Sequence, residues 1–303
     1  MSSNVKGIWF ALFSALGFGC MPIFANFAYQ SDASVDTVLT LRFLIAAIAL
    51  WVVVIWRGAP VWIGWESVIK SLLLGIAGYA VMSYCYFSAL TYISASLTSL
   101  LLYLYPLFVT IFSLLLGKEK WEMRKGLALL ISTVGIGLLV GLSTGTLSVK
   151  GILLGASSGL IYSIFILVTR QVGSQVPVLT LTAYMVTGAF FALFAMSLVK
   201  GTAGLTPLPP AIGYIAAIAL LSTVAAITLF NASLQLIGAT KASILSTFEP
   251  VFTVLLAYLF FQEQMSVWQM AGGALILTAL FLLQRPASQK FNHQVLSRKD
   301  VTG

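Results

Sequence analysis

Charged residues are scarce in this chain of 303 residues. Asp, Glu, Lys and Arg make up 8% of it, and 60% of the residues are apolar by type. Soluble domains carry roughly 25% charged residues, because a globular surface needs polar groups to cover it. The composition therefore excludes an ordinary soluble domain and predicts an all-α protein that has the lipid bilayer as its solvent.

Histidine and cysteine are also nearly absent. The single histidine, His293, lies in a polar stretch near the end of the chain, and Cys20 and Cys85 both fall within apolar runs. These residues supply neither a metal-ligand set nor a disulfide framework. The sequence also contains no nucleophile–base pair and no phosphate-binding glycine loop. We therefore expect no enzymatic activity, no catalytic residue, no bound metal and no cofactor.

Apolar runs fill most of the sequence. A helix that crosses a bilayer needs about 20 apolar residues. Ten runs of that kind fit here, at residues 7–29, 35–56, 67–90, 95–116, 124–142, 150–170, 178–199, 211–235, 242–261 and 267–284. We predict ten transmembrane helices joined by short loops, which leaves no room for a separate soluble domain.

The sequence repeats itself at an offset of 144 positions. The matched landmarks are Val5–Ile8 with Val149–Ile152, Pro106 with Pro250, and Glu119 with Glu263. Each half holds five helices, and because five is odd the second half begins on the opposite side of the membrane. We predict two inverted five-helix repeats, residues 1–142 and 149–285, and a polar cytoplasmic tail at residues 286–303.

The net charge of +8 follows a membrane pattern. With the N-terminus inside, all but three of the 16 Lys and Arg residues fall on cytoplasmic segments. The exceptions are Lys150 and Lys200, on outer loops, and Arg42, within a helix. This distribution obeys the positive-inside rule, so we expect no nucleic-acid partner. It predicts a multi-pass protein of the plasma membrane, which here means a bacterial inner membrane. Both termini are expected in the cytoplasm.

Two prolines and a carboxylate interrupt apolar helices near their middle. Pro106 frees the carbonyl of Leu102 and Pro250 that of Ser246, since proline removes the amide that would bind it. A carbonyl freed in lipid needs a partner or a cavity, so both prolines are candidate cavity-shaping kinks. Beside the second kink, Glu249 is costly in a membrane, and it can bind a substrate amine, carry a coupling proton or hydrogen-bond a neighbouring helix.

A second charge and several hydroxyl groups also lie at membrane depth. Three roles are open to Arg42: snorkelling to the surface, pairing with Glu249, or holding an anionic group of a substrate. Aromatic and polar side chains near the two kinks predict a cavity that suits amino acids, amines or planar metabolites. The residues expected to line it are Tyr79, Ser83, Tyr86, Tyr103, Tyr105, Asn231 and Glu249.

The chain resembles the ten-helix EamA-like branch of the drug/metabolite transporter superfamily. The resemblance covers residues 5–285. It rests on the two five-helix halves, the prolines of the fourth and ninth helices, Glu249-Pro250, and Leu41-Arg42-Phe43. It implies export or exchange of small metabolites, often amino acids or related compounds. It also implies a central cavity lined mainly by helices 3, 4, 8 and 9, with contributions from helices 1 and 6.

The sequence thus predicts a secondary transporter, and an exporter is the expected direction. It would act on a small-molecule substrate by alternating access around a cavity at the midplane of the bilayer. The alternative is a membrane channel or a receptor-like protein without coupled transport. Proton coupling, and the choice between a monomer and a homodimer, stay open at this level.

Overall fold

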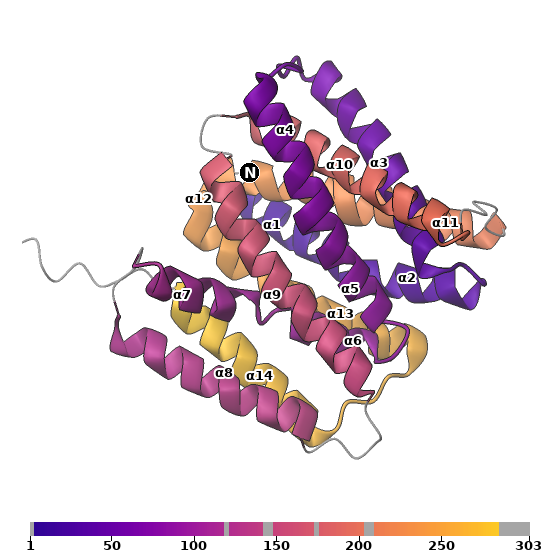
Figure 1. Cartoon of the computed structure of the whole chain (residues 1–303). Coiled ribbons are helices and arrows are strands. Elements are labelled where there is room, and N and C mark those ends of the chain that lie inside the picture. Colours follow the sequence, from indigo (N-terminus) through magenta and orange to yellow (C-terminus); the bar gives the residue numbers. More distant parts are fainter. Residues whose placement is uncertain (1–2, 118–120, 142–147, 173–175, 203–208, 285–303) are drawn as a thin grey trace, which may run out of the picture.

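A computed structural model describes residues 3–117, 121–141, 148–172, 176–202 and 209–284. All regular structure within these residues is helical (Figure 1). The first half contains α1 (Ser3–Gly19), α2 (Met21–Gln30), α3 (Val35–Trp56), α4 (Trp65–Leu73), the π-helix η1 (Leu74–Ala80), α5 (Val81–Ala89), α6 (Ala95–Leu102), α7 (Tyr105–Leu115) and α8 (Met123–Gly141). The second half contains α9 (Val149–Val172), α10 (Val178–Val199), α11 (Pro209–Ala219), the π-helix η3 (Leu220–Ala225), α12 (Ala226–Ser246), α13 (Phe248–Phe261) and α14 (Val267–Gln284).

Eight segments of the described residues are long and apolar enough to cross a membrane. They are Ser3–Gln30, Val35–Trp56, Trp65–Ala89, Ala95–Leu115, Val149–Thr169, Val178–Val199, Pro210–Gly238 and Lys241–Phe261. The remaining two predicted helices coincide with α8 and with α14, which contains a shorter apolar stretch, Val267–Leu283. Large apolar side chains such as Trp56, Leu115 and Met123 are exposed on the exterior, as suits a lipid-facing surface.

Several of the membrane-length segments are broken rather than continuous. The helix predicted at residues 7–29 is one membrane-length segment, Ser3–Gln30, with a local interruption at Cys20 and with Pro22 in the first turn of α2. Other interruptions lie between α6 and α7, just before Pro106, at Gly238 within α12, where φ is 80°, and at Thr247, just before Pro250. Proline suits the first turn of a helix because the amides there have no partner within the helix.

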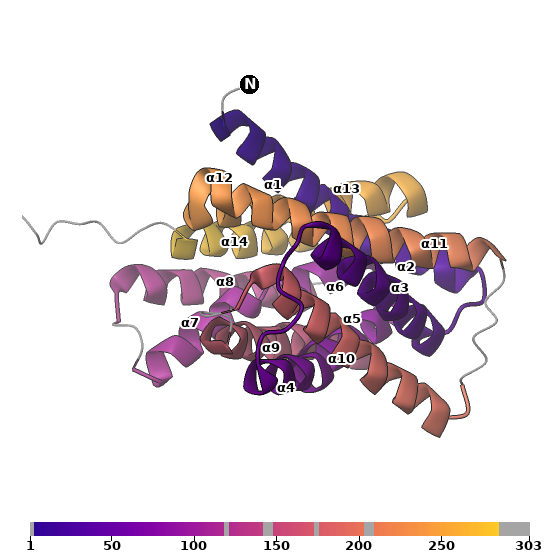
Figure 2. The ribbon, with the colours of Figure 1, turned by 90° about the horizontal axis from the view of Figure 1, so that it is seen from above.

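The most extensive helix contacts join the two halves of the chain. α1 packs on α12, α3 on α10, α5 on α9, and α8 on α14. Figure 2 shows α8 and α14 lying side by side. The same close contact occurs twice at the offset of 144, which relates Gly7 to Gly151 and Ile93 to Ile237. A β-carbon at Gly7 would lie 2.5 Å from Ile237, and one at Gly151 would lie 2.7 Å from Ile93. The contacts of α1 with α12 are thus repeated, with the halves exchanged, by those of α9 with the chain after α5.

Two glycines allow α10 to lie directly against α4 and η1. A β-carbon at Gly75 would lie 2.0 Å from the carbonyl oxygen of Met185, and one at Gly188 would lie 2.4 Å from that of Leu72. Real β-carbons do not approach backbone oxygens so closely, so either alanine would push the helices apart. These glycines therefore set the spacing of the helices that flank one side of the cavity described below.

Replacing Gly75 or Gly188 by Ala is expected to destabilise the purified protein. Overpacking of a tight core costs roughly 1–3 kcal/mol, so the midpoint of thermal unfolding should fall by several degrees. Gly213→Ala is the matched control, because nothing lies within 4 Å of its β-carbon position. That variant should keep or slightly raise the midpoint, as Gly→Ala does in an open helical position. Equal midpoints for all three variants would contradict the assigned packing.

Candidate functional site: a central aromatic cavity

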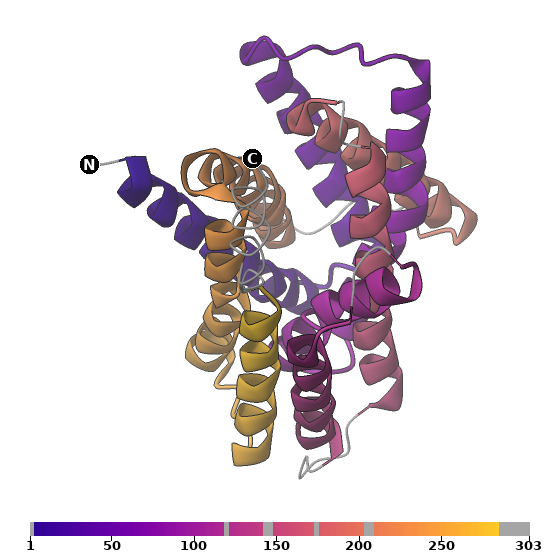
Figure 3. The same ribbon diagram turned by 90° about the vertical axis from the view of Figure 1, so that its left-hand side faces the viewer.

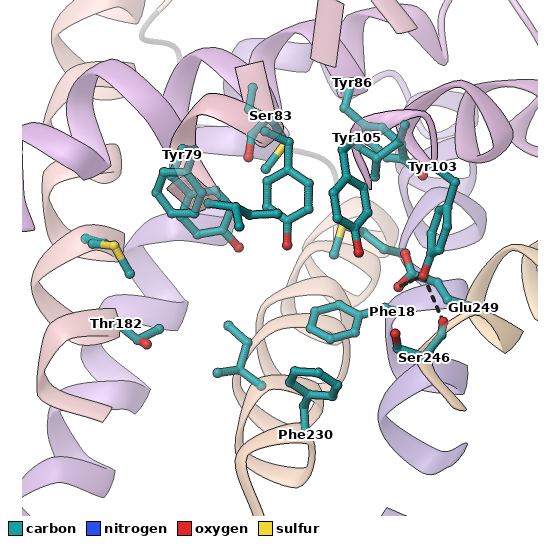
Figure 4. A pocket seen from close by; sticks show the side chains of 18 of the residues that line it. Phe18, Tyr79, Ser83, Tyr86, Tyr103, Tyr105, Thr182, Phe230, Ser246 and Glu249 are labelled. Carbon is teal, nitrogen blue, oxygen red and sulfur yellow. Dashed lines mark hydrogen bonds between the residues drawn. The ribbon is translucent and has the colours of Figure 1, made fainter. Parts of the chain in front are cut away.

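The helix breaks of both halves face one internal cavity of about 530 Å³. This volume lies within the range of sites that bind small molecules, roughly 300–1,000 Å³. Its walls come from the first three transmembrane segments, the α6–α7 break, α9, α10, α12 and α13 (Figure 4). Helices of both halves therefore contribute to the same space.

All seven side chains expected to line a cavity lie on the wall of this one. Tyr79 belongs to η1, and Ser83 and Tyr86 belong to the following α5. The other four are Tyr103 and Tyr105 at the α6–α7 break, Asn231 on α12 and Glu249 in the first turn of α13. The fold thus collects residues that are spread over most of the sequence.

A row of aromatic rings lines one side of the cavity. The ring centroids of Tyr105 and Tyr162 lie 4.7 Å apart, those of Tyr162 and Phe165 6.0 Å, and those of Phe165 and Tyr79 5.7 Å. Tyr103 extends the series, 5.8 Å from Tyr105. Such distances are typical of favourable aromatic pairs. Two of these contacts are stacked and two are edge-on, so the rings form an aromatic wall against which an apolar part of a ligand can pack.

Sequence reasoning did not identify the apolar part of the wall. The unpredicted lining residues include Phe18, Phe165, Phe230 and Met185, together with Thr182 of α10. An apolar side chain in a membrane helix suits lipid, a helix neighbour and a cavity equally well, so the sequence carries no signal that separates the three. The lining tyrosines, Asn231 and Glu249 gave a signal because polar groups are costly in lipid, whereas the polar Thr182 was missed.

Glu249 takes part in a hydrogen-bonded group at the second helix break. The hydroxyl of Tyr103 lies 2.8 Å from the carbonyl oxygen of Ser246 and 2.9 Å from Oε2 of Glu249. Figure 4 shows these three residues together at the cavity wall. The Ser246 carbonyl is the one that Pro250 leaves without its helical amide partner. The Tyr103 hydroxyl, contributed by the first half, therefore takes the place of that missing amide.

The Tyr103 hydroxyl has one proton, but both the Ser246 carbonyl and an ionised Glu249 carboxylate are acceptors. If the Tyr103 hydroxyl donates to the Ser246 carbonyl, its oxygen is free to accept, and both short contacts are satisfied only when Glu249 carries a proton. If Glu249 is ionised, it competes with the carbonyl for the same hydroxyl proton. The hydrogen bonding of the break is therefore linked to the protonation state of Glu249.

Arg42 is buried beside the cavity, with 1% of its surface exposed. Its guanidinium lies over the rings of Phe43 and Phe87, 4.9 and 5.0 Å from their centroids. Nε donates to the Thr223 hydroxyl at 3.3 Å, and a terminal nitrogen donates to the Tyr79 hydroxyl at 3.5 Å. Both hydrogen bonds are long and neither acceptor is charged.

Two of the roles predicted for Arg42 are wrong for this arrangement. The buried guanidinium does not snorkel to the surface. Among the described residues it also forms no ion pair with Glu249, whose carboxylate instead contacts Tyr103. The direction in which Arg42 points depends on the rotation of α3, which is apolar around most of its circumference. The third role, binding an anionic group, is compatible with its place on the wall.

Comparison with known proteins adds evidence independent of the geometry. The sequence model of the EamA-like transporter family matches residues 5–141 and, a second time, residues 149–285. The uncharacterized transporter YcbK of Bacillus subtilis (strain 168) is 26% identical over 276 residues, which cover 88% of each chain. An uncharacterized transporter of Archaeoglobus fulgidus is 28% identical over 214 residues, which cover 70% of this chain and 76% of its own.

A solved structure has the same fold. It is described only as the crystal structure of a protein, and it superposes with a TM-score of 0.62 over 99% of each chain. The sequence identity is 19%, so this likeness concerns the fold alone.

Proposed function

Because the chain belongs to the EamA-like transporter family, we propose that it is a secondary transporter of small metabolites such as amino acids or related compounds, and that it works as an exporter. Membership of the family makes it a multi-pass membrane transporter. The substrate class, the direction and the mechanism are the proposal. The substrate would occupy the cavity between the two halves, and alternating access would expose that cavity to one side of the membrane at a time.

The cavity wall carries the proposal for the substrate. It presents a basic group, Arg42, and an acidic group, Glu249, among tyrosine hydroxyls and aromatic rings. Arg42 lacks a charged partner among the described residues, and a buried cation without one is costly. A carboxylate on the substrate would offset that cost, and the tyrosine hydroxyls of the wall would accept hydrogen bonds from its amine. An amino acid or a related compound carries both groups.

The arrangement of helices supports two inverted repeats that cover residues 1–142 and 149–285. Contacts of α1 with α12 and α13 have counterparts in those of α9 with α5 and α7, as expected when the halves are exchanged. We propose that all ten predicted helices cross the membrane and that both termini are cytoplasmic. The predicted tail at residues 286–303 lies outside the described residues.

Part of the cavity lining supports loading from the cytoplasm and therefore export. Its lining includes Val178 and Thr182 in the first turns of α10, and Ser243 near the end of α12. With the N-terminus inside, all three lie on the cytoplasmic half of the protein. Figure 3 shows the indigo α1, where the chain begins, beside the orange α12. A substrate would thus load from the cytoplasm.

Binding and flux measurements test this proposal. A thermal-shift screen of the detergent-purified protein against amino acids, amines, nucleosides and sugars should give a rise in unfolding midpoint for amino acids, because a ligand of the folded form raises apparent stability. In proteoliposomes the same compound should show saturable uptake and counterflow. Flux without saturation or counterflow would indicate a channel. A response restricted to nucleosides or sugars would overturn the proposed substrate class.

A further inference from the structure

The turn after α13 presents a carboxylate in a fixed position. α13 ends at Phe261, and Gln262 adopts the left-handed conformation with φ 54°. The amide of Gln262 donates to the carbonyl of Tyr258 at 3.0 Å, and that of Glu263 donates to the carbonyl of Ala257 at 3.3 Å. These bonds terminate the helix and hold the backbone of Glu263. The Glu263 side chain therefore starts from an ordered turn.

The Glu263 carboxylate binds the first turn of α6. Oε1 accepts from the amide of Ala95 at 3.0 Å, and Oε2 accepts from the amide of Ser96 at 3.3 Å and from its hydroxyl at 2.8 Å. The amides at a helix start have no partner within the helix and carry partial positive charge. A carboxylate there makes charge-assisted hydrogen bonds, which are stronger than neutral ones. One side chain thus clamps α13 of the second half to α6 of the first.

The clamped helices run from the cavity to the outer side of the protein. Every residue of α6 from Ala95 to Leu101 is buried, whereas only its last residue, Leu102, lines the cavity. On α13, Glu249 lines the cavity and the helix then runs outward to Phe261. The same two helices therefore meet at Tyr103 and Glu249 beside the cavity and at Glu263 at their outer ends.

We propose that Glu263 is a gating residue, the latch that holds the outer end of the cavity closed. The inference rests on the proposed alternating access, since opening to the outside requires α6 and α13 to part at this point. In each cycle the carboxylate must then release the amides of Ala95 and Ser96. Weakening the latch shifts the population towards the form that is open to the outside, without any change in the residues that line the cavity.

A cavity cysteine reports the state of the latch. In a Cys20→Ser, Cys85→Ser background, Ser83→Cys places a thiol on the cavity wall. Intact cells are treated with a membrane-impermeant thiol reagent, and the rate of labelling is measured with and without Glu263→Gln. In Glu263→Gln, one carboxylate oxygen that accepted from a backbone amide is replaced by an NH₂ group, which cannot accept. The clamp is therefore weaker, and the labelling rate should increase about tenfold. An unchanged rate in folded protein would overturn the proposal.

Further variants distinguish loss of the latch contact from a general loss of protein stability. Ser96→Ala removes the 2.8 Å hydroxyl contact and should accelerate labelling by a smaller factor, so it decides the question if Glu263→Gln fails to fold. Ser94→Ala removes a different cap of the same helix, the acceptor for the amide of Leu97 at 3.2 Å. It should reduce folded yield and leave the labelling rate unchanged. Glu66→Gln, which removes an exposed carboxylate, should change neither.

The latch and the proposed function fail in different ways. Thr146→Cys should react from outside and Gln289→Cys should not, which fixes the sidedness of the assay. Faster labelling of Glu263→Gln together with channel-like flux would leave the latch in place and overturn the carrier. Unchanged labelling together with normal counterflow would overturn the latch alone.

Discussion

Glu249→Gln is expected to abolish pH-driven accumulation of substrate while counterflow stays within about twofold of the native rate. The Tyr103 hydroxyl lies between the Ser246 carbonyl and the Glu249 carboxyl group, 2.8 and 2.9 Å away. Gln can donate to the tyrosine oxygen as a protonated Glu does, but it cannot release a proton. The fold and the exchange of substrate should therefore persist, while the link between proton and substrate is lost. Counterflow and pH-driven uptake, measured side by side in proteoliposomes, check this.

The same measurements discriminate among the three roles considered for Glu249. If it binds the substrate amine, Glu249→Gln lowers affinity and counterflow together. If its role is structural, Gln retains all activity, whereas Glu249→Ala lowers the folded yield because Tyr103 loses a partner. Proton-driven uptake by Glu249→Gln at the native rate and with the native pH profile would exclude the coupling role.

Polar groups at membrane depth were predictable from the sequence, because placing a polar side chain in lipid is unfavourable in free energy. Tyr103 and Glu249 were selected on that ground, and both lie on the cavity wall. The sequence also placed the freed carbonyl at Ser246, since it follows directly from the position of Pro250. It did not identify the donor to that carbonyl. Tyr103 is 143 positions away, and only the packing of the two halves brings it there.

Contacts between distant helices account for most of what the sequence did not reveal. Glu263 was recognisable as a landmark of the repeat, but its partners Ala95 and Ser96 lie 168 and 167 positions away. Glu119, its counterpart at the offset of 144, lies outside the described residues. The π-helical segments η1 and η3 were also missed, because a shift from i→i−4 to i→i−5 bonding leaves no mark in apolar periodicity.

Pro250→Ala is expected to reduce transport by about tenfold while folded yield stays close to that of the native protein. Alanine at this position restores a backbone amide that can bind the Ser246 carbonyl. The Tyr103 hydroxyl then loses its present acceptor, and its proton is available to Glu249. The break between α12 and α13 also becomes a continuous helix, which stiffens the segment that carries Glu249.

Three variants measured together make this prediction specific. Tyr103→Phe should reduce transport to a similar extent as Pro250→Ala, because each breaks the same chain of hydrogen bonds from a different side. Pro106→Ala alters the corresponding kink of the first half and should also reduce transport more than it reduces folded yield. Initial rates of counterflow, normalised to the amount of monodisperse protein, provide the comparison. Native transport by both proline variants would reduce Pro106 and Pro250 to packing features, because a kink that shapes the cavity cannot be removed without altering the path of the substrate.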